Sequence, residues 1–161
     1  MTASQEDLET IAGLVKKART AFVTTVGPEG ELLSRPLAVV ERDFDGTLYF
    51  LVAEPSPKTA QLEAHPHVNV AITAGDSYLS IAGTASVSRD QAKIDELWNP
   101  HAEAWFEGGR EDPAVALLKV DADSAEYWTM DDPKPVALVK YAVAMVKGEE
   151  PDVATNRSVD L

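Results

Sequence analysis

The stretch "AFVTTVGPEGELLSRPLAVV" (residues 21–40) decides the kind of fold that this chain forms. A run rich in β-branched residues (21–26) ends at Gly-Pro-Glu-Gly, and a second run (32–40) begins just beyond that turn. A third run, "TLYFLV" (47–52), follows an Asp-Gly turn. Connections this short join antiparallel neighbours, so the sequence predicts a three-strand meander rather than a doubly wound parallel sheet.

The rest of the chain continues the pattern of short strands and connecting helices. Strands are predicted over 68–73, 77–87, 114–120 and 125–130, with Gly83 as a bend or bulge of the kind found in barrels. Helices are predicted over 5–19, 59–64, 88–97 and 135–148, the last with Val136, Val139, Val143 and Val146 at helical spacing. Asn99-Pro100 is predicted to end the third of these helices, and the segment that follows is predicted as a loop. We therefore expect a mainly β domain, an antiparallel barrel of six to seven strands, over residues 1–148, followed by a polar tail over 149–161.

Composition limits the possible partners. The 161 residues include 27 Asp and Glu against 14 Lys and Arg, a net charge of -13, which disfavours nucleic acid and anionic membranes as partners. The chain has no cysteine, which excludes disulfides and thiol chemistry, and it has no apolar run long enough to span a bilayer. Residues 1–20 lack the features of a signal peptide, so a cytoplasmic location is expected. His65-Pro66-His67 lacks the further ligands of a metal site, and no metal is expected.

Arg35 stands out within its predicted strand. Side chains alternate along a strand, so Arg35 shares a face with Leu33, Leu37 and Val39. An arginine among aliphatic neighbours needs a partner, because an unpaired buried charge is very unfavourable. That partner is either a carboxylate such as Glu41 or a bound anion, and the strand pattern alone leaves both open.

Ser56-Pro57-Lys58 begins the helix that follows the third strand. Serine suits the N-cap and proline suits the first helical position, which leaves free N–H groups at Lys58 and Thr59. Such a helix start attracts phosphate, although an ordinary capped helix with a solvated lysine has the same pattern. Because a meander can place this helix start beside Arg35, we interpret the two cations together as a phosphate site.

Several segments, taken in order, resemble a known family. They are "FVTTVGPEGELLSRPLAVV", "DFDGTLYFLVAEPSPK", "HPHVNVAI", "YLSIAGTASV", "IDELWNPHAEAWFEGG" and "ALLKVDADSAEYW". Over about residues 8–130 the chain is similar to the general stress protein 26 branch of the pyridoxamine 5'-phosphate oxidase-like proteins. The resemblance implies an FMN-binding split β-barrel, and a homodimer that holds two flavins at its interface.

The resemblance also implies a set of flavin-binding residues. On the matching positions these are Ser34, Arg35, Pro36, Leu37, Phe50, Leu51, Val52, Ser56, Lys58, Thr59 and Ser77. An aromatic wall from the second subunit has three candidates, in descending order Trp128, Trp98 and Trp105, and core packing is the alternative role for each.

One departure from the family narrows the expected activity. Residues 131–161 contain Arg157 as their one arginine and no histidine, whereas the true oxidases end in a segment with both. Oxidation of vitamin B6 is therefore not expected, and the leading hypothesis is a flavin-dependent oxidoreductase of the general stress type. The alternatives are a binding or storage protein without turnover, and the same fold with FAD, the deazaflavin F420 or haem in place of FMN.

Overall fold

A computed structural model describes residues 1–130, 134–148 and 154–161. The helices are α1 (Gln5–Lys17), α2 (Pro57–Ala64), α3 (Gln91–Leu97), α4 (Pro100–Trp105) and α5 (Lys134–Lys147). The strands are β1 (Thr20–Val26), β2 (Leu32–Ala38), β3 (Thr47–Ala53), β4 (His67–Ala74), β5 (Ser77–Ser88), β6 (Val115–Met130) and β7 (Ala154–Asp160). This is the mainly β architecture that the sequence predicts.

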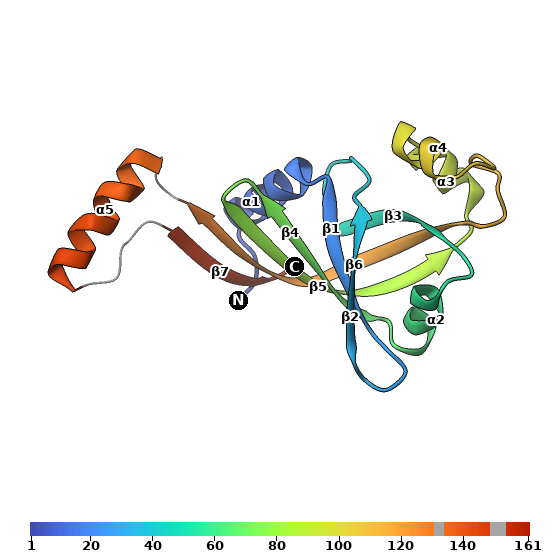
Figure 1. Cartoon of the computed structure of the whole chain (residues 1–161), viewed down its shortest axis with the longest axis horizontal. Coiled ribbons are helices and arrows are strands. Elements are labelled where there is room, and N and C mark those ends of the chain that lie inside the picture. Colours follow the sequence, from blue (N-terminus) through green and yellow to red (C-terminus); the bar gives the residue numbers. More distant parts are fainter. Residues whose placement is uncertain (131–133, 149–153) are drawn as a thin grey trace.

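The strands form one antiparallel sheet that curls into a split barrel (Figure 1). Its order is β2-β1-β4-β5-β6-β3, and β7 adds to β6. The two end strands, β2 and β3, approach each other without pairing along their length. The predicted three-strand meander is therefore wrong beyond its first hairpin: β1 pairs with β2, but β3 pairs with β6 at the far edge of the curled sheet. A hydrogen bond from the Val40 N–H to the Tyr49 carbonyl (3.2 Å) joins the chain just beyond β2 to β3. The seam between β2 and β3 is therefore the place where the barrel is incomplete.

The barrel interior is filled by the alternate side chains of the strands. Phe50, Ile81 and Leu118 are fully buried there. Helix α1 adds Ile11 and Leu14 to the same core and starts at a capping box in which Ser4 and Asp7 bond each other's backbone N–H groups. Burial of alternate side chains fixes the register of β3, because a shift of one residue would turn Leu48, Phe50 and Val52 outward.

Two predicted strands are one continuous strand in the structure. The segments 114–120 and 125–130 form the 16-residue β6, which pairs with β3 near its start and with β7 near its end. The prediction of a break was wrong because the irregularity at this point is a bulge within a continuous strand. Ala82 pairs with Ser124 and Gly83 pairs with Ala122, so Asp123 is an extra residue in β6, and the ladder continues on both sides of it.

The segment after residue 98 also differs from its prediction as a loop. Asn99 does not only end a helix; its side chain accepts the Ala102 N–H (3.0 Å) and caps α4, with Pro100 at the first helical position. Asparagine at the N-cap and proline after it begin helices more often than they end them. The polar tail supplies β7, in which Val159 is buried against the core.

Candidate functional site

The seam between β2 and β3 holds two basic side chains that come from different elements. Lys58 lies in the first turn of α2, where the Ser56 hydroxyl caps the helix and accepts a hydrogen bond from Lys58 Nζ (3.3 Å). Thr59 completes the capping box, since its hydroxyl accepts the Ser56 N–H (3.1 Å). Pro57 removes one of the free N–H groups and starts the helix in a fixed conformation. The capping residues Ser56 and Thr59 thus hold Lys58 in place in the first turn of α2.

Arg35 projects from β2 toward the same helix. Its guanidinium donates to the Thr25 hydroxyl on β1 (2.8 Å) and to the Gln61 side-chain oxygen on α2 (3.2 Å). Thr25 in turn donates to the same Gln61 oxygen (2.7 Å) and is almost completely buried. These partners are neutral, so they orient the guanidinium and leave its charge uncompensated.

The two cations are close enough to affect each other. Burial, and after it the positive charge of Arg35, lowers the pKa of Lys58 below its ordinary value. Within the described residues, neither side chain forms an ion pair with a carboxylate, and Glu41 is not a partner of Arg35. Two adjacent, unneutralised cations are unfavourable alone and become favourable when an anion binds between them.

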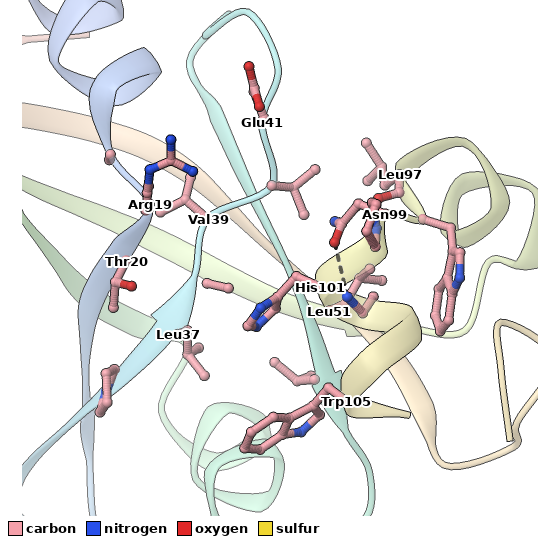
Figure 2. Close-up of a pocket in the computed structure, with 18 of the residues that line it drawn as sticks. Arg19, Thr20, Leu37, Val39, Glu41, Leu51, Leu97, Asn99, His101 and Trp105 are labelled. Carbon is pink, nitrogen blue, oxygen red and sulfur yellow. Dashed lines mark hydrogen bonds between the residues drawn. The ribbon is translucent and has the colours of Figure 1, made fainter. Parts of the chain in front are cut away.

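A groove of about 1090 Å³ runs from Lys58 along the seam. Pro36 and Leu37 of β2 and Leu51 of β3 line it, and α3 and α4 form the opposite wall. Figure 2 shows His101 and Trp105 projecting from α4 into this groove, toward β2. Their rings lie stacked with centroids 6.4 Å apart. A volume and lining of this kind suit a ligand with a large planar ring.

The structure places the predicted residues in three groups. Arg35, Ser56, Lys58 and Thr59 lie together at the α2 start, and Pro36, Leu37, Leu51, Val52, Trp98 and Trp105 line the groove. Two predicted residues belong to none of these groups. The Phe50 side chain is buried in the core, and Phe50 does not line the groove. Ser34 is exposed on β2 and shares a hydrogen bond with Thr24 (2.6 Å).

Ser77 and Trp128 form the third group, at another end of the sheet. Ser77 begins β5, and Trp128 of β6 pairs with Tyr78. Neither lines the groove of its own chain. Trp98 packs on Phe106 (6.0 Å between centroids), while Trp105 is 72% exposed. Trp98 and Trp105 therefore line the groove of their own chain, whereas Trp128 does not.

Four residues of the site have no counterpart among the predictions. Thr25 and Gln61 hold Arg35, and Asn99 and His101 line the groove from the α3–α4 segment. Gln61 lies three residues after Lys58, so helical spacing indicates that the two share a face. No comparable sequence signal marks His101, because α4 itself was predicted as a loop.

No group of three His, Cys, Asp or Glu side chains among the described residues is placed to hold a metal ion. No helix in the described part is long and apolar enough to cross a membrane.

Comparison with known proteins identifies the family. The family model described as pyridoxamine 5'-phosphate oxidase like matches residues 6–152. The chain belongs to the pyridoxamine 5'-phosphate oxidase-like family. Among curated relatives of this family, protein bli-3 from Neurospora crassa is 36% identical over 110 residues, which is 61% of this chain and 52% of bli-3. The alignment thus spans about half the length of that relative.

Two further relatives show the branch to which this chain is similar. General stress protein 26 from Bacillus subtilis is 25% identical over 97 residues, which cover 57% of this chain and 69% of the relative. The crystal structure of the general stress FMN/FAD binding protein from Xanthomonas citri is 33% identical, with a TM-score of 0.71 over 81% of this chain and 93% of that one. The predicted resemblance to the general stress protein 26 branch and the predicted split-barrel fold are confirmed.

Proposed function

We propose that this protein binds FMN in the seam groove and acts as a flavin-dependent oxidoreductase of the general stress type. The observation that carries the proposal is the pair Arg35 and Lys58, which lie together without a carboxylate partner among the described residues of a chain with net charge -13. A phosphate monoester is the ligand group that such a pair suits, because it offers two negative charges and several acceptor oxygens.

The flavin-binding role of each residue follows from the chemistry of its side chain. Arg35 and Lys58 would hold the phosphate, together with the Ser56 hydroxyl and the α2 N–H groups. Leu37, Leu51 and Val52 would flank the ring from the strands, and Trp98 and Trp105 from the α3–α4 segment. The bound flavin supplies the redox chemistry, and this chain supplies binding, orientation and exclusion of water.

A second copy of the chain completes the proposed site. Ser77 and Trp128 do not line the groove of their own chain, so they reach a flavin from a partner subunit in this proposal. The homodimer is therefore part of the proposed function. The Xanthomonas citri relative is named as an FMN/FAD binding protein, which supports a flavin and leaves FAD as the alternative ligand.

Titration of the apoprotein with FMN and with riboflavin tests the phosphate assignment. Arg35→Ala and Lys58→Ala should each weaken FMN binding by about 1 to 3 kcal/mol, the scale of a lost charged hydrogen bond, and leave riboflavin binding unchanged. Equal FMN affinity in both variants and the parent would rule out this phosphate site. Mass spectrometry of the ligand released from purified protein distinguishes FMN from FAD, F420 and haem.

Anaerobic reduction tests the oxidoreductase assignment separately. A flavin-loaded oxidoreductase should lose its yellow colour when NADH or NADPH is added. A protein that binds flavin and stays oxidised with each biological reductant would be a binding or storage protein instead.

A further inference from the structure

Helix α5 turns its apolar side chains toward solvent. Successive residues of a helix are rotated by about 100°, so the apolar residues of α5 fall on one continuous stripe about 160° wide. In order around the helix they are Met145, Leu138, Ala142, Val146, Val139 and Val143. The large members are between 47% and 90% exposed, whereas Ala144, on the opposite side, is buried. Surface helices of globular proteins normally face the other way, with the apolar stripe against the core.

The position of α5 in the fold explains why its stripe is uncovered. The helix connects the end of β6 to the start of β7 and projects beyond the sheet at the left of Figure 1, away from α1 and the barrel core. A helix of 14 residues is only marginally stable in water without tertiary packing. An exposed stripe of this width on such a helix indicates a contact surface.

Charge argues for the kind of molecule that covers the stripe. Residues 134–147 contain three lysines and no Asp or Glu, while the whole chain carries 27 acidic residues against 14 basic ones. A basic apolar helix is attracted to an acidic protein surface, and the rest of this chain provides one. An anionic lipid surface would attract α5 but repel the body to which it is attached.

The sheet of a second copy also offers apolar area. Phe22 on β1 and Tyr78 on β5 are each more than half exposed, on the side of the sheet opposite to the buried Val23 and Leu79. Exchange of two identical arms gives a closed, twofold contact, in which each copy both contributes and receives a helix.

We propose that α5 is a dimerisation arm whose apolar stripe packs on a second copy of this chain. This proposal concerns the same homodimer as the function proposed above, but the packing of α5 does not depend on a bound flavin. It assigns the contact to a segment far from Arg35 and Lys58 in the sequence.

Hydrogen exchange combined with light scattering tests the proposal on the full-length protein. At a concentration where light scattering finds a dimer, the backbone amides of residues 138–146 should be protected at least tenfold, and dilution to monomer should remove this protection. Exchange at the unprotected rate in the dimer would overturn the proposal. Protection that persists in the monomer would also overturn it, because α5 would then pack on its own chain.

Substitutions in the apolar stripe of α5 provide a second test. Val139→Glu combined with Val143→Glu places two acids on the stripe, and should raise the dimer dissociation constant at least tenfold. Leu32→Glu is the matched control, since Leu32 is 72% exposed at the β1–β2 turn and should leave dimerisation unchanged. An unchanged dimer in the double variant, or equal loss in the control, would contradict the assignment.

Two further measurements separate this proposal from its competitors. Sedimentation with vesicles containing phosphatidylserine should leave the protein in the supernatant. Protein that sediments with the vesicles through α5 would contradict the proposal, because the stripe would then be a membrane contact. Arg35→Ala should lose FMN affinity and keep the dimer, so failure of the arm and failure of the phosphate site give different results.

Discussion

Gln61→Glu is the variant that most directly separates a ligand site from a structural role of Arg35. The Gln61 side-chain oxygen lies 3.2 Å from a guanidinium nitrogen of Arg35 and 2.7 Å from the Thr25 hydroxyl. Glutamate has nearly the same shape, so it places a carboxylate oxygen at that position. The substitution therefore creates the ion pair that a purely structural arginine would have been expected to make.

The expected effects on folding and on binding have opposite signs. A partly exposed ion pair adds up to about 1 kcal/mol to the free energy of unfolding, so the variant should be at least as stable as the parent. Pairing withdraws Arg35 from the phosphate, which removes a charged hydrogen bond worth about 1.5 to 3 kcal/mol. Repulsion between the new carboxylate and the phosphate acts in the same direction. FMN affinity should therefore fall more than tenfold.

Flavin fluorescence titrations and thermal unfolding measure both effects. Riboflavin, which lacks the phosphate, should bind the variant and the parent equally. Gln5→Glu at the exposed first residue of α1 makes the same change in net charge away from the groove and should leave FMN affinity unchanged. A Gln61→Glu protein with parental FMN affinity, or with equal losses for FMN and riboflavin, would refute the assignment of Arg35 to the phosphate.

Three further predictions concern stability. Gly83→Ala should destabilise the fold by about 1 to 3 kcal/mol in urea titrations, because a Cβ there would clash with the Asp121 carbonyl oxygen. Gly13→Ala in α1 should instead stabilise by about 0.5 to 1 kcal/mol, because a Cβ there meets nothing within 4 Å. Hydrogen bonds from Ser4, then from Tyr127, lower the pKa of Asp7 to about 2, so the stability that Asp7 contributes is complete above its unfolded pKa of 3.8 and should be lost as the pH falls toward 2. Burial, then the bond to Asp7, raises the pKa of Tyr127 to about 12, so its contribution should be lost as the pH rises from 10 to 12, and Tyr127→Phe should reduce this alkaline loss in unfolding titrations.

The strands and turns were predictable because their signals are local. Gly-Pro-Glu-Gly and Asp-Gly end runs of β-branched residues, and the structure has turns at both places. The bend predicted at Gly83 is present as the register shift between β5 and β6. Each of these features depends on residues that are neighbours in the sequence, so the sequence carries the information within a few positions.

The missed elements depend on contacts between distant segments. Strand β7 has a polar sequence and one deeply buried residue, Val159, and it forms because the long β6 offers it an edge. A polar tail gives no sign of that edge. Helix α4 was missed for a different reason, since Asn99 and Pro100 were interpreted as the end of α3 although the same pair begins a helix.

The two cations of the candidate site were predictable from the sequence, whereas the residues that hold Arg35 in place were not. The spacing in β2 and the start of α2 indicated Arg35 and Lys58, and the structure brings both to the seam. Thr25 could have been inferred from the hairpin register, because Val23 lies opposite Arg35 and Thr25 is the next residue on that face. Gln61 becomes a partner only once α2 packs beside β1, and the sequence does not determine that packing.

The most informative property of the site is that Thr25 and Gln61, which hold Arg35, are uncharged. The chain has nearly twice as many acids as basic residues, so an arginine that needed only burial had many carboxylates available. It is held instead by a hydroxyl and an amide, which satisfy its geometry and preserve its charge. Burial, and after it the positive charge of Arg35, lowers the pKa of the neighbouring Lys58, and an acid at position 61 would offset the second of these effects. Two adjacent cations of this kind are unfavourable alone and become favourable when a dianion binds between them. In the proposed function, the same physical property that makes the site unfavourable when empty would make it selective for phosphate.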